Sequence, residues 1–170
     1  MRRIFLFVLC LLLLLCSCDA GKDSPKVRQE LINACDLNEK NIEQIGIMFD
    51  LFDTAFENLK KTDSPTEEDF TAYAESVLYA WETFEDEALL SERISEKLEK
   101  AKADDPESEE VSELGDFQSD FNSVATSFLI CGLSLTLEDK IGESEAEELF
   151  EGINSASQFF YSVDWNKNSD

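Results

Sequence analysis

Histidine is absent from this 170-residue sequence, which removes most of the common catalytic and metal-binding sites. Ser-His-Asp and Cys-His nucleophile systems need an imidazole base, and many zinc and haem sites use imidazole ligands. The Glu-x-x-His pattern of di-iron helical bundles is excluded for the same reason. The sequence therefore predicts a protein that is not an enzyme and that has no cofactor.

Basic residues are scarce, because 14 Lys and Arg stand against 38 Asp and Glu for a formal net charge of −24. Nucleic acid is disfavoured as a partner, since phosphate binding needs clustered cations, and so is an anionic lipid surface. Two interpretations of the charge stay open: it attracts a basic protein of the cell envelope, or it only keeps the domain soluble. Thirteen Phe and 43% hydrophobic residues argue against a disordered acidic tail.

The N-terminus carries an apolar run, Ile4 to Leu15, that contains no charged residue and follows Arg2 and Arg3. This arrangement is typical of a secretory signal peptide. The run is too short for a membrane-spanning helix, which needs roughly 20 residues. We expect a cleaved signal peptide and no permanent span.

The stretch Leu15-Cys16-Ser17-Cys18 resembles the lipobox of bacterial lipoproteins, in which small residues precede an acylated cysteine. The resemblance implies cleavage after Ser17, attachment of diacylglycerol to the Cys18 thiol and acylation of the new amino group. Cys16 fits less well, because bulky leucines precede it. The other interpretation is an ordinary signal peptide that happens to end in cysteines.

Asp19 follows the lipidated cysteine and resembles the inner-membrane retention signal of enterobacteria-like sorting. We expect a protein that is lipid-anchored to a bacterial membrane and faces the periplasm or the exterior. The domain organisation predicted is a signal peptide at 1–17, a lipidated tether at 18–23, a helical bundle domain at 24–165 and a frayed C-terminus at 166–170.

Apolar residues recur at alternating spacings of four and three through most of the remaining chain, which predicts amphipathic helices. One helix is predicted from Pro25 to Lys61, with Asn38 as the polar member of its apolar stripe. Asn38 is either a buried residue that fixes the helix register or a frayed or exposed position, and both interpretations stay open. A second begins at a capping box at Ser64 and reaches Ala101, with a bend between Leu89 and Arg93, where the spacing changes. The stripe members in these two helices are Leu31, Cys35, Ile42, Ile45, Phe49, Phe52, Phe56, Leu59, Phe70, Ala74, Val77, Trp81, Phe84, Ala88, Ile94 and Leu98.

A third helix is predicted to begin near Pro106 or Ser108, and a fourth at a capping box at Ser144. Their stripes run through Phe117, Phe121, Val124, Phe128, Cys131 and Leu135, and through Ala146, Leu149, Ile153, Ala156, Phe160 and Val163. Strand signals are absent. We therefore expect an all-α fold: an antiparallel four-helix bundle with two long and two shorter helices.

Cys35 and Cys131 are the thiols that remain in the predicted domain. An oxidising compartment favours a disulfide between them. An up-down bundle instead separates them by roughly 15 to 20 Å along its axis, at about 1.5 Å per residue, too far for a bridge. A disulfide and two buried free thiols are therefore both possible outcomes.

Acidic residues suggest cation sites at two places. Asp164 to Asp170 alternates oxygen side chains like the opening of an EF-hand loop, but Ser169 replaces the expected glycine. Asp50, Asp53 and Glu57 share one helix face. So many acids produce such coincidences that a frayed terminus and a solvated face are the expected outcomes, and no metal site is predicted.

Tyr161 and Trp165 lie near the C-terminus, where burial is difficult, and are the aromatic residues predicted to form an exposed contact surface. The function expected is that of a non-catalytic binding or adaptor module. Two alternatives are kept: an inhibitor or immunity-like protein that occludes a basic toxin or hydrolase, and a carboxylate- or metal-dependent carrier or enzyme. The last requires a pocket of roughly 300 Å³ or more with converging acids.

Overall fold

The computed structural model describes residues 26–162, and every regular element in that range is an α-helix. The prediction of an all-α fold is confirmed. The described residues form six helices where four were predicted, because two of the predicted helices are divided. They are α2 (Gln29–Cys35), α3 (Glu39–Lys60), α4 (Glu67–Ala88), α5 (Leu90–Asp104), α6 (Glu109–Glu138) and α7 (Glu143–Tyr161).

The helix predicted from Pro25 to Lys61 is interrupted between α2 and α3, so that prediction is wrong at this point. Asp36 ends α2 in a left-handed conformation, with φ of 50°. Asn38 then caps α3, because its side chain accepts the Asn41 N–H at 3.0 Å while the Asn41 side chain accepts the Asn38 N–H at 3.2 Å. Asn38 is thus an exposed cap, for which Asn is well suited, and not a buried member of the apolar stripe.

The second predicted helix is divided at Leu89, within the segment where the change in spacing predicts a bend. Leu89 has a left-handed φ of 50° and separates α4 from α5. The Glu85 carboxylate spans this break by accepting the Ser91 N–H at 2.9 Å. The side chain thereby satisfies a backbone donor in the first turn of α5 that has no partner within the helix.

Two helix starts differ slightly from those predicted. α4 is capped by Thr66, whose N–H donates to the Asp69 carboxylate at 2.8 Å, and not by Ser64. α7 is capped by Gly142, whose N–H donates to Glu145 at 3.1 Å. The acids at the third helical position set the caps, because each carboxylate accepts the backbone N–H of its cap residue.

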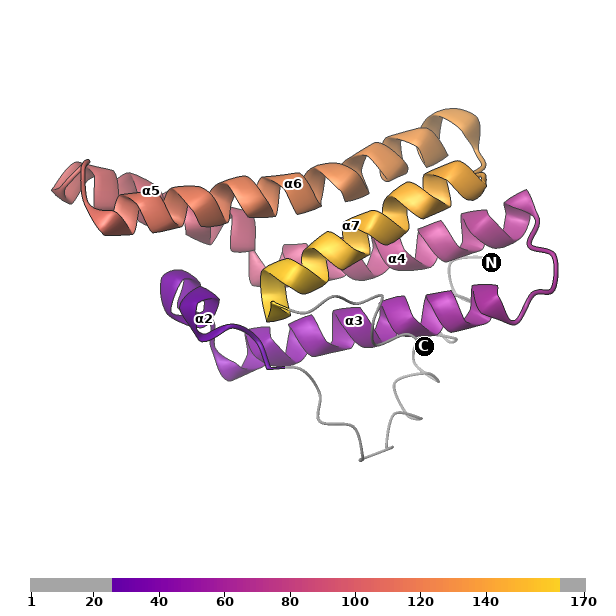
Figure 1. The fold of residues 1–170 in the computed structure, drawn as a ribbon, viewed down its shortest axis with the longest axis horizontal. Helices are drawn as coiled ribbons and strands as arrows, with labels where there is room; N and C mark the ends of the chain where they lie inside the picture. Colours follow the sequence, from indigo (N-terminus) through magenta and orange to yellow (C-terminus); the bar gives the residue numbers. More distant parts are fainter. Residues whose placement is uncertain (1–25, 163–170) are drawn as a thin grey trace.

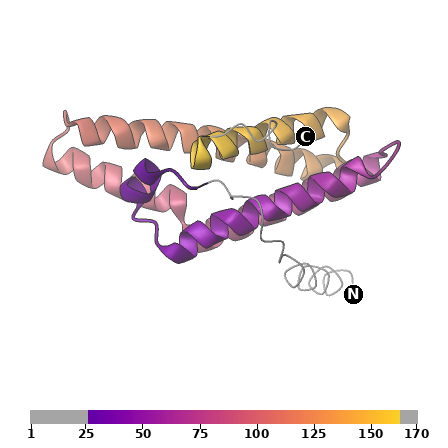
Figure 2. The same cartoon turned by 60° about the horizontal axis from the view of Figure 1, so that its bottom comes forward.

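The helices form two hairpins that pack together (Figure 1). α3 and α4 form one hairpin, α6 and α7 form the other, and α7 lies against both α6 and α4. α5 runs beside the first half of α6, and the two helices together project beyond the end of α3, as Figure 2 shows from a second direction. The short α2 packs against α5. This projection of α5 and α6 creates a corner that α2 only partly fills.

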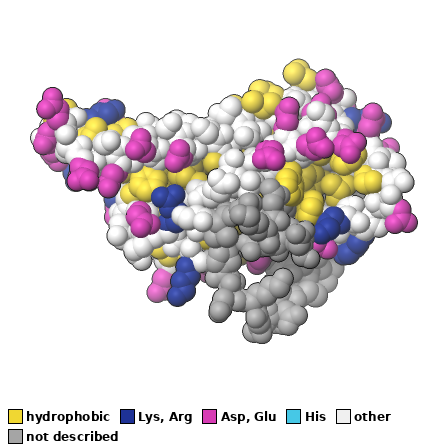
Figure 3. Space-filling model, in the orientation of Figure 1, with side chains coloured by type: hydrophobic (Ala, Val, Ile, Leu, Met, Phe, Trp, Pro, Cys, Tyr) yellow, Lys and Arg dark blue, Asp and Glu magenta, His cyan; other side chains and the backbone are white. Residues whose placement is uncertain are grey.

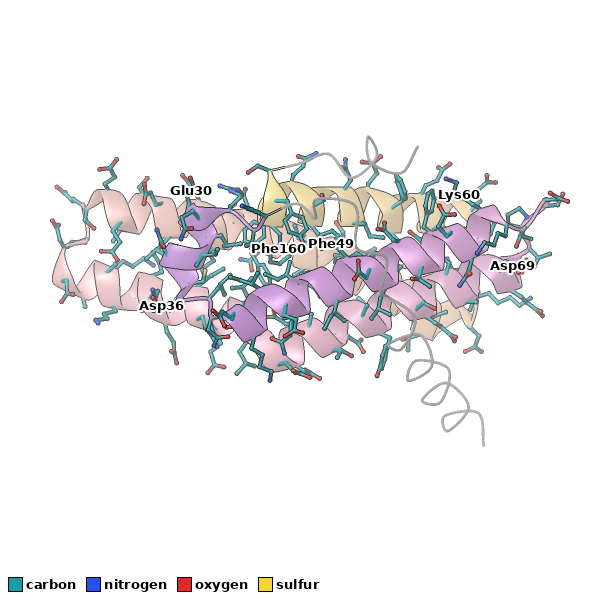
Figure 4. All side chains as sticks on the ribbon, turned by 90° about the horizontal axis from the view of Figure 1, so that it is seen from below. Glu30, Asp36, Phe49, Lys60, Asp69 and Phe160 are labelled. Atoms are coloured by element: carbon teal, nitrogen blue, oxygen red, sulfur yellow. The ribbon has the colours of Figure 1, made fainter. Side chains whose placement is uncertain are left out.

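Aromatic rings dominate the main core, as the apolar stripes predict. Trp81 of α4 stacks on Phe128 of α6 with ring centres 4.4 Å apart, and Phe52 of α3 stacks on the same Phe128 at 5.9 Å. Phe49 and Phe160 meet edge to face between α3 and α7 at 6.1 Å (Figure 4). A smaller cluster of Leu98, Ala101 and Leu114 joins α5 to α6 in the projecting part.

Candidate functional site

A groove of about 630 Å³ lies in the corner between α2, α5 and α6. Its apolar lining is Ala34 of α2 with Leu114 and Phe117 of α6. Leu114 belongs to the small core cluster, so the base of the groove is packed against α5. The volume lies within the range of about 300 to 1,000 Å³ that is usual for ligand sites. We call this feature the acidic groove, for the charges on its rim described below.

Arg28 fixes the first turn of α2 at one end of the acidic groove. Its backbone N–H donates to the Phe160 carbonyl oxygen at 2.9 Å, and its guanidinium donates to the Phe159 carbonyl oxygen at 3.3 Å. The guanidinium also lies 5.5 Å from the centre of the Phe117 ring. A cation is favourable here, because the last carbonyl groups of α7 carry partial negative charge. Contacts within the protein therefore fix the Arg28 side chain in place.

Two cations of α5 fix the other end of α2. The Lys97 ammonium pairs with the Asp36 carboxylate at 2.7 Å and donates to the Asn33 carbonyl oxygen at 3.4 Å. Arg93 donates to the Asp36 carbonyl oxygen at 3.3 Å. The hydrogen bond from Lys97 and its positive charge lower the pKa of Asp36. These contacts neutralise the C-terminal end of α2.

Acidic side chains form the rim of the groove. Glu30 extends from α2, and four acids come from successive turns of α6: Glu110, Glu113, Asp116 and Asp120. All five are exposed, and none forms an ion pair or hydrogen bond with another of the residues 26–162. Figure 4 shows Glu30 and Asp36 near opposite ends of α2. Lys97 is paired with Asp36, so Arg28 is the one cation of the lining without a carboxylate partner, and the five rim carboxylates leave the groove with an excess of negative charge.

A second, smaller cleft between α3 and α4 is a weaker candidate. Its volume is about 260 Å³. Two of its three charged residues already pair with each other, because Glu87 lies 3.3 Å from the Lys40 ammonium, and Glu87 also accepts a hydrogen bond from Gln44. A ligand there would have to displace these contacts, whereas the rim of the acidic groove is free to accept new ones.

Cys35 and Cys131 are both buried free thiols in the structure, so the bridge considered from the sequence is not formed. Cys35 lies in α2 and Cys131 in α6. Burial raises the pKa of each thiol to about 11. Such a pKa favours the protonated thiol at neutral pH. They act as small core residues.

Tyr161 does not provide the exposed contact that the sequence predicts. Its ring centre lies 4.9 Å from that of Phe49, and the residue is half-buried. Burial, together with the charges of Asp50 and Asp53, raises the pKa of its hydroxyl. Close contact with α3 explains the error, because position in the sequence says little about which helix face meets a neighbour. Trp165 lies outside the described residues.

Of the remaining predicted sites, one lies within the described residues and the others lie outside them. Asp50, Asp53 and Glu57 lie on α3, and within residues 26–162 no three acidic or cysteine side chains are grouped closely enough to hold a metal ion. Cys18, the signal peptide and the segment from Asp164 to Asp170 lie outside the described residues. Predictions that rest on them stay predictions.

The sequence interpretation missed the acidic groove, although part of its signal is visible. Glu110, Glu113, Asp116 and Asp120 recur at spacings of three and four, so they line one side of α6. Nothing in that pattern shows that α2 lies opposite. The chain matches no family model, no curated protein and no solved structure, so the site rests on its own geometry.

Proposed function

We propose that this chain is a membrane-tethered, non-catalytic binding module that holds a basic segment of a cell-envelope protein in the acidic groove. The observation that carries the proposal is the combination of an apolar base at Leu114 and Phe117 with five carboxylates that have no described partner. Carboxylates of this kind attract Lys and Arg side chains, and the apolar base accepts their aliphatic stems or a neighbouring apolar residue.

The expected ligand is an extended or helical segment that carries cations along one edge and one or two apolar side chains. Four of the rim acids follow α6 over three turns, so they match cations spaced along a peptide better than a single compact cation. The net charge of −24 raises the association rate with such a segment, while the groove selects where it binds. Affinity should fall as salt concentration rises.

Tethering is the second part of the proposal. The lipobox-like stretch supports acylation of Cys18, and two or three acyl chains give a stable anchor where one does not. The helical domain, which we regard as an antiparallel bundle elaborated by two helix breaks, would then be held next to the bilayer. Cys18→Ser should abolish lipid attachment to the full chain, measured as the mass of the mature protein, while Cys16→Ser should leave it unchanged. The reverse result would show that the anchor is misassigned.

The groove is tested by binding of a short fluorescein-labelled peptide of lysine, alanine and one central leucine. The full chain is placed in nanodiscs of zwitterionic lipid, and empty nanodiscs supply the background. The test variant converts the four rim acids of α6 to amides: Glu110→Gln, Glu113→Gln, Asp116→Asn and Asp120→Asn. We expect its affinity to fall about tenfold, since exposed ion pairs contribute up to about 1 kcal/mol each.

A matched control removes the same charge elsewhere, through Glu75→Gln, Glu82→Gln, Asp86→Asn and Glu92→Gln. These four acids are exposed on α4 and α5 and do not line the groove. We expect the control to lose no more than about twofold in affinity through its reduced long-range field. Equal losses in the two variants would show that net charge alone attracts the peptide, and the groove would then have no binding role.

A ligand carrier is the second candidate, because the groove exceeds the volume that this function requires. It predicts binding of an uncharged apolar probe, such as a fluorescent fatty alcohol, with an affinity that salt does not change. The Lys and Ala peptide would then compete poorly with this probe. The two candidates are therefore separated by the charge of the ligand that wins the competition and by the effect of salt.

A further inference from the structure

The C-terminal half of α6 exposes a row of aliphatic side chains on the face opposite the core. Leu129, Ile130, Leu133 and Leu137 are exposed by 61%, 49%, 52% and 82%. Figure 3 shows hydrophobic side chains rising along the upper edge of the molecule above this part of α6. We call these four residues the α6 apolar face. Soluble surfaces usually scatter such residues singly, so their concentration on one helix face indicates a contact.

This part of α6 also has no charge of either sign. Residues 121–137 contain no Asp, Glu, Lys or Arg, in a chain where 31% of residues are charged. At about 1.5 Å per residue the uncharged stretch is about 25 Å long. Acidic residues bound it at both ends, with Asp120 on one side and Glu138 on the other. The face is therefore a limited apolar strip with acidic residues at both ends.

Three hydroxyl groups beside the α6 apolar face already donate hydrogen bonds to the backbone. The Thr126 hydroxyl donates to the Asn122 carbonyl oxygen at 2.6 Å, and the Ser123 hydroxyl to that of Ser119 at 3.0 Å. The Thr136 hydroxyl donates to the Gly132 carbonyl oxygen at 2.8 Å. Ser and Thr make such bonds inside membrane helices, where water cannot serve as a partner. Removing water from this face therefore leaves these donors hydrogen-bonded.

We propose that the α6 apolar face inserts shallowly into the bilayer next to the N-terminal anchor, so that α6 lies along the membrane surface. This inference rests on the proposed tethering. By length and composition α6 alone among the described helices could cross a membrane, but its opposite face is committed to the core through Phe121 and Phe128. Only the outer face is available, so the geometry is that of an interfacial helix.

The tether allows this orientation. Seven residues lie between Cys18 and Lys26, the first described residue, and the eight steps from one to the other span at most about 28 Å. The domain would thus stay close enough for the face to touch the bilayer. A second copy of the chain is a poorer occupant, because a helix face about 25 Å long and 10 Å wide is far smaller than the roughly 800 Å² that each partner of a stable complex buries. Two such acidic chains also repel each other.

The acids that bound the face determine which lipid it accepts. Asp120, Glu138 and Asp139 would lie near the headgroups when the leucines are inserted. Anionic headgroups repel them, whereas zwitterionic headgroups do not. Insertion should therefore be deepest in phosphatidylcholine, weaker in phosphatidylglycerol, and partly restored in phosphatidylglycerol by salt.

The test places a fluorescent label on the face in the full chain. Leu133→Cys is labelled with a nitrobenzoxadiazole dye and reconstituted into phosphatidylcholine vesicles that contain lipids with nitroxide groups on their acyl chains. Glu92→Cys, on the exposed side of α5, is the matched control, and the unsubstituted chain gives the background from native thiols. We expect at least twofold quenching at position 133, little at position 92, and less at position 133 in phosphatidylglycerol.

Flotation of the same vesicles separates this inference from the tethering on which it rests. A chain that does not float with the vesicles would overturn both the tether and the membrane role of α6. A chain that floats while position 133 remains unquenched would overturn the membrane role of α6 alone. A dye response that follows protein density, with no dependence on the nitroxide lipids, would assign the face to a second copy and would also overturn the inference.

Discussion

At the scale of single residues, Gly152 shows how closely α6 and α7 approach. A Cβ atom built on Gly152 would lie 2.9 Å from the Cβ of Ser127 on α6, a separation that real side chains essentially never show. Gly46, within α3, has no atom within 4 Å of the same position. Both glycines lie inside helices, where glycine normally costs stability relative to alanine. The pair therefore separates packing from helix propensity.

Gly152→Ala should lower the free energy of unfolding by about 1 to 3 kcal/mol, because overpacking forces the two helices apart. Gly46→Ala should raise it by about 0.5 to 1 kcal/mol through better helix propensity alone. Urea unfolding followed by circular dichroism measures both free-energy changes, with the parent and the two variants covering the same residues. If both variants were stabilised to the same extent, close contact between α6 and α7 at Gly152 would be disproved.

Glu85 predicts a pH dependence. Burial raises the pKa of this carboxyl, while the N–H groups of Leu90 and Ser91 hold it down only in part. A raised pKa in the folded state favours the protonated form there, so the folded state loses stability as pH rises from about 4.5, the usual pKa of Glu, through the folded pKa. Glu85→Gln keeps an oxygen that can accept from Ser91 and removes the charge. It should match the parent chain below pH 4 and exceed its unfolding free energy at pH 7.

The control for this prediction is Glu82→Gln, which removes the same charge from an exposed position of α4. Chemical unfolding at several pH values should show a pH-dependent gain for Glu85→Gln that Glu82→Gln lacks. A gain of equal size in both variants would mean that general charge repulsion, and not burial at the α4–α5 break, produces the effect.

At the scale of helices, Leu89 determines where α4 ends. It holds a left-handed φ of 50°, which is unfavourable for a residue with a Cβ, and its N–H donates to the Glu85 carbonyl oxygen at 2.8 Å. Leu89→Gly and Leu89→Ala both remove the exposed leucine side chain, and they differ only in the Cβ atom, which disfavours the left-handed conformation. The glycine variant should be the more stable by about 1 kcal/mol, the reverse of the order inside a helix. Thermal unfolding of the two variants decides, and a more stable alanine variant would indicate that α4 and α5 join into one helix in solution.

The buried faces of the helices could be predicted from the sequence, because spacing alone sets which residues share a face. Phe52, Val77, Phe128 and Ile153 all lie in predicted stripes and are all buried. The breaks were harder to predict. The spacing change marked Leu89, but Asn38 continues an unbroken stripe, and only its ability to bond the Asn41 N–H reveals that it is a cap.

The two surface sites escaped the sequence interpretation for different physical reasons. The acidic groove depends on the packing of α2 against α5. These two helices are distant in the chain, so no local sequence pattern predicts that they meet. The α6 apolar face was missed because that half of α6 is apolar on both sides. The stripe through Phe128 and Cys131 already accounted for an amphipathic helix, so the apolar residues outside it were not considered. The exposed Leu129 and Leu133, which do not belong to that stripe, are the residues that indicate the second apolar face.

At the scale of the whole molecule, the charge of −24 opposes the compact state through self-repulsion. Ion pairs such as Lys40–Glu87, Lys102–Glu99 and Lys140–Glu67 are exposed and contribute little, so salt has more repulsion than attraction to screen. The melting temperature should rise by several degrees between about 0.01 M and 0.15 M NaCl, as the Debye length falls from about 30 Å to 8 Å. Scanning fluorimetry measures this, and the variant with four amides on α4 and α5 should show a smaller rise. A fall in melting temperature would show that the ion pairs dominate.

Arg28 also has a mechanical consequence. It joins the first helix of the described chain to the last turn of α7 through Phe159 and Phe160, and it touches Phe117 of α6. A pull from the proposed tether enters the fold just before this residue. The force is then shared among three contacts of Arg28 with two other helices, so α2 does not carry it alone. The proposed tether would thus apply force at Arg28, where the first described helix is bonded to the end of the last one.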